Sequence, residues 1–231
     1  GANNVAVGAE SLESNQTGND NVAVGRQALE QNTASNNTAV GRLALYANTT
    51  GTQNVAVGTI SLDSNTTGYN SVAVGYTSLG VNTTGHSNAA FGAYSLDANT
   101  TGSSNTGLGY GALSGNTTAN NNTAVGNNAM LANTTGTHNV AVGHETLDAN
   151  TTGNFNTSLG SRSLTSNNGS SNVAVGYETL ETNSSGQNNT ALGTRALEGN
   201  TTASNNTAVG YQALLANTTG TNNTAVGTEA L

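Results

Sequence analysis

Small hydrophobic and polar residues recur along the chain in a fixed order, and each repeat ends at a glycine. The clearest copy is Gly210–Gly227, which reads GYQALLANTTGTNNTAVG. Eleven of the thirteen intervals between closing glycines are 17 residues long, and two are 16. A fixed period this short predicts a solenoid in which each repeat forms one coil. The closing glycines are Gly8, Gly25, Gly41, Gly58, Gly75, Gly92, Gly109, Gly126, Gly143, Gly160, Gly176, Gly193, Gly210 and Gly227.

The residues before each closing glycine predict a short β-strand. With the glycine as position 0, position −1 is Val in ten copies, and position −3 is Val or Thr in all but one. Position −2 is Ala in twelve copies and position −4 is Asn in thirteen. The β-branched residues favour a strand. We expect the chain to turn a corner at the glycine with a positive φ.

A second apolar position follows the glycine. Position +3 is Ala, Ser or Thr, and we expect a second extended segment there, as in Tyr211–Leu214, with two parallel sheets in a flattened roll. A short helical turn at the same residues is the alternative, although a single turn is poorly stable alone. Position +4 is predicted to be the core column and comprises Leu12, Leu29, Leu45, Leu62, Leu79, Leu96, Leu113, Met130, Leu147, Leu164, Leu180, Leu197 and Leu214.

Position +7 is Asn in every complete copy, usually followed by Thr-Thr-Gly. Asn and Thr bond to nearby backbone in loops, and we expect the Gly of this loop to be left-handed. The two short repeats lose their residue here. Because coils stack about 4.8 Å apart, the asparagines are predicted to form a hydrogen-bonded ladder. Its members are Asn15, Asn32, Asn48, Asn65, Asn82, Asn99, Asn116, Asn133, Asn150, Asn167, Asn183, Asn200 and Asn217.

Thin coils of this kind predict self-association. Each coil has two large apolar side chains to bury, Val at −1 and Leu at +4. The strand is apolar on both faces, with Val at −1 inside and Ala at −2 outside, or the reverse. Strands of that type are normally covered on both faces. A continuous alanine column on the outside would let another chain pack closely, so we expect a homo-oligomer with its chains side by side.

The composition of the chain limits the classes of binding partner that we expect. Of 231 residues, 12 are acidic and four are basic, giving a net charge of −8. The four arginines are scattered along the sequence, so we expect binding neither to nucleic acid nor to an anionic membrane surface. Cysteine is absent, which excludes disulfides and thiol chemistry within these residues. No apolar run of membrane-spanning length occurs in the chain.

The motif N-[VT]-A-V-G-x-x-[AS]-L resembles the head repeats of YadA-like trimeric autotransporter adhesins. It is also similar to repeats in phage tail-fibre and other surface-fibre proteins. The resemblance covers the whole chain. It implies a left-handed parallel β-roll, assembly as a trimer and an extracellular, cell-surface or virion-surface location. It also implies host or cell-surface glycans or matrix as partners. The period here is longer than adhesin heads usually have, and the N-T-T-G loop is additional.

Several motifs were weighed as sites of chemistry. N-x-[ST] sequons are abundant, with Asn48, Asn65 and Asn217 as candidate glycosylation sites, but the loop ladder alone accounts for them. Neither a metal site nor a cofactor is predicted, because His86, His138 and His144 occupy three different columns. No nucleophile–base motif is readable, so we expect no enzyme activity. The acidic residues at +5 predict a solvated stripe and are Glu13, Glu30, Asp63, Asp97, Asp148, Glu181 and Glu198.

The sequence therefore predicts an all-β parallel β-solenoid of about 14 coils, spanning 1–231 as a single array. The expected function is a non-enzymatic shaft or head of an extracellular fibre. The alternative is an ice- or flat-surface-binding solenoid that uses the paired threonines at +8 and +9. Both ends read like internal repeats without caps, so we expect a segment of a longer fibre or end-to-end filaments.

Overall fold

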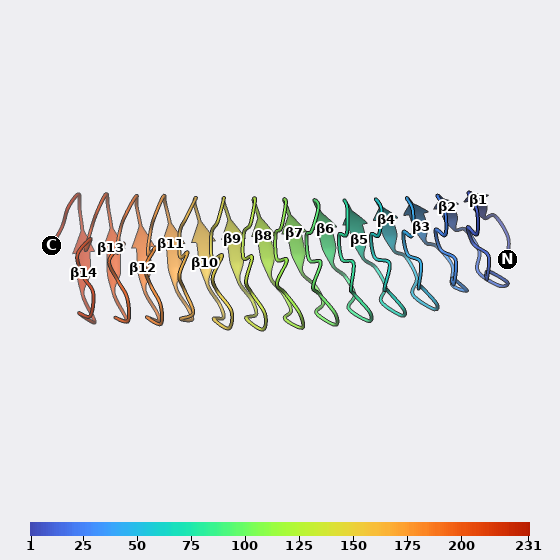
Figure 1. The fold of residues 1–231 in the computed structure, drawn as a ribbon. Helices are drawn as coiled ribbons and strands as arrows, with labels where there is room; N and C mark the ends of the chain where they lie inside the picture. The colour runs from blue at the N-terminus through green and yellow to red at the C-terminus, as the bar shows by residue number, and fades with distance from the viewer. The chain divides into compact units, whose positions relative to one another are not determined.

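A computed structural model describes all residues from 1 to 231. The chain divides into two compact units, Gly1–Thr118 and Ala119–Leu231. Each unit is a parallel β-solenoid in which every repeat forms one coil with one three-residue strand (Figure 1). This confirms the predicted all-β solenoid and its 17-residue repeat. No part of the structure forms a helix with the length and hydrophobicity of a membrane span.

The strands coincide with the [VT]-A-V segments before the closing glycines. Within each unit they pair in parallel and in chain order, so that −3 lies beside −3 and −1 beside −1; β4 and β5, for example, pair Val55 with Val72. The N-terminal unit contains β1 (Val5–Val7), β2 (Val22–Val24), β3 (Thr38–Val40), β4 (Val55–Val57), β5 (Val72–Val74), β6 (Ala89–Phe91) and β7 (Thr106–Leu108). The C-terminal unit contains β8 (Thr123–Val125), β9 (Val140–Val142), β10 (Thr157–Leu159), β11 (Val173–Val175), β12 (Thr190–Leu192), β13 (Thr207–Val209) and β14 (Thr224–Val226).

The second predicted strand is wrong, and so is the helical alternative. Residues 211–216 form turns, and Gln212 and Leu214 have φ angles of 53° and 52°. The same left-handed φ recurs at +2 and +4 throughout the chain. A non-glycine residue pays roughly 1–2 kcal/mol for this conformation. Hydrogen bonds between coils offset that cost, as where Leu62 N–H donates to Ser78 O at 3.0 Å.

The core is narrower than the sequence suggests. Alanine at −2 points inward and is buried, as at Ala56, Ala73 and Ala90. The large residues at −1, which were expected in the core, point outward; Leu108 and Leu192 are each 46% exposed. Of the two orientations that the sequence left open, the structure has alanine inside, so the outer alanine column expected to pack against another chain is wrong. Leu and Met at +4 supply the large core side chains: eleven of the thirteen are 0% exposed, and the two exceptions, Leu12 (9%) and Leu214 (4%), lie near the chain ends. Most of the small residues at +3, such as Ala44 and Ser61, are also buried.

Glycine recurs at two places in the coil, and its role differs between them. The closing glycines have φ angles near +135°, for example 138° at Gly75, which confirms the predicted corner. The glycines of the N-T-T-G loop, such as Gly51 and Gly68, do not have a positive φ, so the expected left-handed loop is wrong. A Cβ at Gly51 would overlap the carbonyl oxygen of Gly68 in the next coil, although alanine occupies the equivalent position at Ala119 and Ala203.

Candidate functional site

Two columns of buried asparagines run through each unit on the inner side of the coils. In the +7 column, Asn65 Nδ2 donates to Asn48 Oδ1 at 2.8 Å and to Gly68 O at 3.0 Å. Asn82 Nδ2 donates in turn to Asn65 Oδ1 at 2.9 Å. This confirms the predicted ladder. It links successive coils and closes each N-T-T-G loop, so no buried amide in this stretch lacks a partner.

The ladder is interrupted where the repeat is short. In the coil that ends at Gly176, Asn167 Nδ2 donates to Gly169 O at 2.9 Å, two residues along the chain instead of three. Asn150 Oδ1, one coil earlier, is buried and has no hydrogen-bond partner. Asn32 in the other short coil behaves alike, donating to Ala34 O at 2.8 Å. The deleted residue therefore belongs to this loop, and one ladder bond is lost with it.

A second asparagine ladder, which was not predicted from the sequence, lies at position −4. Asn54 Oδ1 accepts from the backbone N–H of Ser71 at 3.0 Å, and Asn54 Nδ2 donates to Gly68 O at 2.8 Å. Thirteen of the fourteen residues at this position are asparagine, with Ser71 the exception. That column was as regular as the +7 column and could have been found by the same reasoning. The carbonyl of Gly68 thus accepts from two asparagines, Asn54 and Asn65.

The paired threonines of the loop differ from each other. Thr66 at +8 is half-buried, and its hydroxyl donates to Thr83 O of the next coil at 3.0 Å. Thr67 at +9 is exposed. Both lie in a bend and not in a strand. Binding of ice or another flat surface through these columns would therefore depend on the +9 residues, because the +8 hydroxyls bond within the solenoid.

The candidate glycosylation sites belong to the +7 ladder. Asn48 and Asn65 are 0% exposed, and Nδ2 of Asn48 already donates to Asn32 Oδ1 and Gly51 O. The folded coil has no space for a sugar on either nitrogen. Asn217 is half-buried, and its Nδ2 donates to Asn200 Oδ1 at 3.2 Å and to Gly220 O at 3.0 Å.

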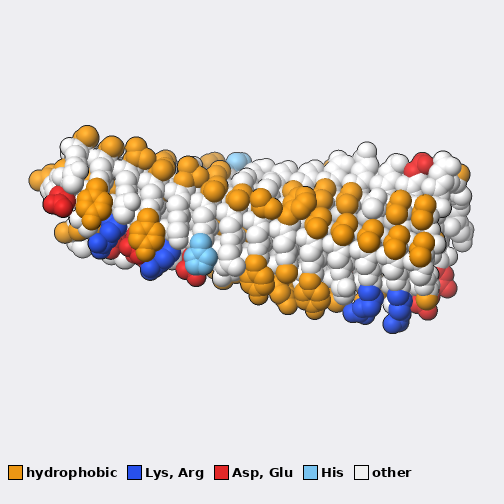
Figure 2. All heavy atoms as spheres, turned by 90° about the horizontal axis from the view of Figure 1, so that it is seen from above, with side chains coloured by type: hydrophobic (Ala, Val, Ile, Leu, Met, Phe, Trp, Pro, Cys, Tyr) orange, Lys and Arg blue, Asp and Glu red, His pale blue; other side chains and the backbone are white.

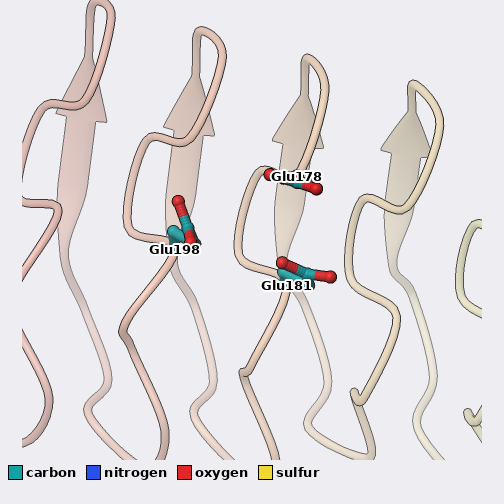
Figure 3. A group of neighbouring side chains, drawn as sticks. All are labelled: Glu178, Glu181 and Glu198. Atoms are coloured by element: carbon teal, nitrogen blue, oxygen red, sulfur yellow. The ribbon is translucent and has the colours of Figure 1, made fainter.

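Three glutamates of neighbouring coils gather near the outer surface of the C-terminal unit. Glu178 and Glu181 lie on one coil and Glu198 on the next (Figure 3), with carboxylate oxygens within 4.8 Å of one another. Three carboxylates could in principle bind a hard cation. Arg162 pairs with Glu178 at 3.0 Å and also with Glu181, while Arg195 pairs with Glu198. The carboxylates are therefore engaged in an ion-pair network, which sequence columns taken singly did not reveal.

The histidines are not part of this group. His86 stacks on Tyr69 with ring centroids 4.6 Å apart, and His138 stacks on Phe155 at 5.1 Å. His144 lies 3.7 Å from the carboxylate of Glu145. Each histidine thus contacts a different neighbour at the surface.

Six of the seven acidic side chains at +5 are partly buried, and Glu13 is exposed. Burial raises the pKa of Asp63 and of Asp97 above the ordinary aspartate value, against hydrogen bonds from nearby backbone that lower it. Burial, and after it the charge of Glu145, raises the pKa of Asp148, whose Oδ1 has no hydrogen-bond partner. Ionised carboxylates at these positions therefore oppose folding at neutral pH.

Acidification is expected to stabilise the protein. A carboxyl whose pKa is higher in the folded state binds protons more tightly when folded. The free energy of unfolding should then rise as the pH falls from 7 through the raised folded pKa values, and level off below the unfolded value of about 3.9. Thermal midpoints measured between pH 7 and 4 test this. Asp63→Asn with Asp97→Asn should raise the midpoint at pH 7 and flatten its pH dependence, whereas Asp20→Asn, at an exposed position, controls for the loss of a charge.

The outer face of the strands carries two uncharged columns, at −3 and −1, of which only the −1 column is apolar throughout. The −3 column contains Val, Thr and one Ala, and the −1 column contains Val, Leu and one Phe. No side chain in either column is charged. Figure 2 shows rows of hydrophobic side chains along this face, with the exposed members including Val40, Val57, Phe91, Leu108, Val142, Leu159 and Leu192.

No known protein family, no curated protein and no solved structure matches this chain.

Proposed function

We propose that this chain is a non-enzymatic shaft or head of an extracellular fibre, built from copies of itself packed side by side. The observation that carries the proposal is the outer strand face. Most coils bury their asparagines at +7 and −4, and every coil presents uncharged, largely apolar residues at −3 and −1 on the outside. Soluble proteins rarely expose a continuous apolar strip of this kind unless another surface covers it.

The repeat spacing of this face suits a second copy. Seven strands of three residues present roughly 330 Å² of flat sheet, from a strand spacing of about 4.8 Å and a rise of about 3.3 Å per residue. A second copy also repeats at the same spacing, so that its outward rows match step for step. Resemblance to the adhesin heads favours three copies.

Charge placed on this face is expected to separate the copies. Val40→Lys with Val57→Lys adds two cations in neighbouring coils at positions 37% and 36% exposed. Burying these charges against a second copy is unfavourable, so the wild type should be oligomeric and the variant monomeric in light scattering after size-exclusion chromatography. Thr50→Lys with Thr67→Lys, at exposed loop positions of neighbouring coils, adds the same charge and should leave the oligomer intact. A wild type that is monomeric at every concentration contradicts the proposal.

A further inference from the structure

Two arginines occupy the same position on neighbouring coils of the N-terminal unit. Arg26 and Arg42 each directly follow a closing glycine. The strands before them pair Val24 with Val40, and Leu43 N–H donates to Arg26 O at 3.0 Å. The two residues therefore lie side by side, about one strand spacing of 4.8 Å apart. Both side chains are exposed at the corner that follows the outer strand face.

Neither guanidinium has a carboxylate partner. The ion pairs of the protein use Arg162, Arg195 and His144, and none includes Arg26 or Arg42. Acidic residues outnumber basic ones by 12 to four, yet neither arginine of this pair forms an ion pair. Two cations at this spacing repel each other, and an anion between them would relieve the repulsion.

We propose that Arg26 and Arg42 together bind a tetrahedral oxyanion, the sulfate ester of an acidic polysaccharide. The inference rests on the proposed extracellular fibre and assigns it a ligand class. A guanidinium presents a planar fork of N–H donors that matches such oxygens. A carboxylate has two oxygens, which one arginine satisfies, whereas a sulfate ester has three terminal oxygens that two neighbouring arginines can share.

The charge of the chain favours a sulfated polysaccharide over nucleic acid. Nucleic-acid binding draws on many phosphate contacts along a basic stripe, and this chain offers two free arginines within a net charge of −8. A single pair is a weak site on its own. Copies of the chain packed into one fibre would present several pairs to the same polymer, and multivalency would raise the apparent affinity.

The test measures binding of the wild-type protein to immobilised dextran sulfate at low ionic strength, with unsulfated dextran as the reference. Arg26→Gln with Arg42→Gln should weaken binding at least tenfold. Arg162→Gln with Arg195→Gln is the matched control, because it changes the net charge by the same two units at arginines that already have partners. It should change binding less than twofold. Circular dichroism confirms that each variant is folded.

Three results overturn the inference. Equal loss in both double variants would mean that net charge alone drives binding. Equal binding to unsulfated dextran would exclude the oxyanion. Tighter binding to anionic vesicles or to DNA than to dextran sulfate would exclude the polysaccharide source. Light scattering on the same samples separates this inference from the proposed function: an intact oligomer without sulfate binding rejects only the ligand, and a monomeric wild type rejects the fibre.

Discussion

Gly75→Ala is expected to destabilise the N-terminal unit by about 3 kcal/mol or more, because it combines a forbidden backbone conformation with a collision between coils. Gly75 has a φ of 138°, a region that residues with a Cβ rarely adopt. A Cβ placed there would lie 2.6 Å from the carbonyl carbon and oxygen of Gly92. Neither atom can move without disturbing the next corner, since Gly92 N–H donates to Val74 O at 2.8 Å.

Urea unfolding followed by far-UV circular dichroism, with hydrogen exchange at the neighbouring coils, measures this effect. Gly80→Ala provides the control within the same coil. Gly80 is buried but lacks a positive φ, and the nearest atom to its Cβ would be Thr77 O at 3.2 Å. We expect that substitution to change stability by less than about 1 kcal/mol. Similar unfolding curves for the two variants would refute the corner argument.

Asn65→Ala is expected to lower the free energy of unfolding by about 2–4 kcal/mol, from one orphaned buried acceptor and a small cavity. Asn48 Oδ1 would lose the 2.8 Å hydrogen bond that it accepts from Asn65 Nδ2. Gly68 O would keep its second donor, Asn54, and Asn82 Nδ2 would keep Gly85 O at 3.0 Å. The loss is therefore concentrated at one oxygen.

Thr67→Ala tests whether the ladder, and not the loop sequence, accounts for that loss. Thr67 lies two residues along the same loop and is exposed. Its substitution should shift the urea midpoint little, within the roughly 0.5 kcal/mol usual for surface positions. If Asn65→Ala and Thr67→Ala lower the free energy of unfolding by the same amount, the asparagine ladder does not hold the coils together. The natural break at Asn150 shows that one unpaired ladder oxygen is compatible with the fold.

The periodic part of the fold was readable from the sequence alone. The 17-residue period, the [VT]-A-V strand, the corner glycine and the +7 ladder each follow from one residue type repeated in one column. Such columns are predictable because stacked coils place identical residues in contact, so a requirement met once must be met at every step. The −4 ladder follows the same rule. It was not predicted because the −4 asparagine was interpreted only as the first residue of the strand.

Tertiary structure decided which face of the strand points inward. Val at −1 and Ala at −2 are both apolar, so alternation gives no direction, and neighbouring positions always face opposite ways. The space opposite the +4 leucine settles it: alanine fits there, as Ala73 does at 0% exposure, while valine is left outside. As a result, the outward apolar column consists mainly of the valines at −1 and not of the alanines at −2. This valine face is the one that we propose for assembly.

The left-handed turn after the closing glycine could not be predicted from the sequence either. Residues such as Leu62 and Ile60, with φ of 49° and 61°, adopt a conformation that their own propensity opposes. Hydrogen bonds to both neighbouring coils stabilise it, because Ile60 N–H donates to Arg42 O and Leu62 N–H to Ser78 O, each at 3.0 Å. The sequence by itself therefore determined what repeats, and contacts between coils determined the conformation and direction of each repeated residue.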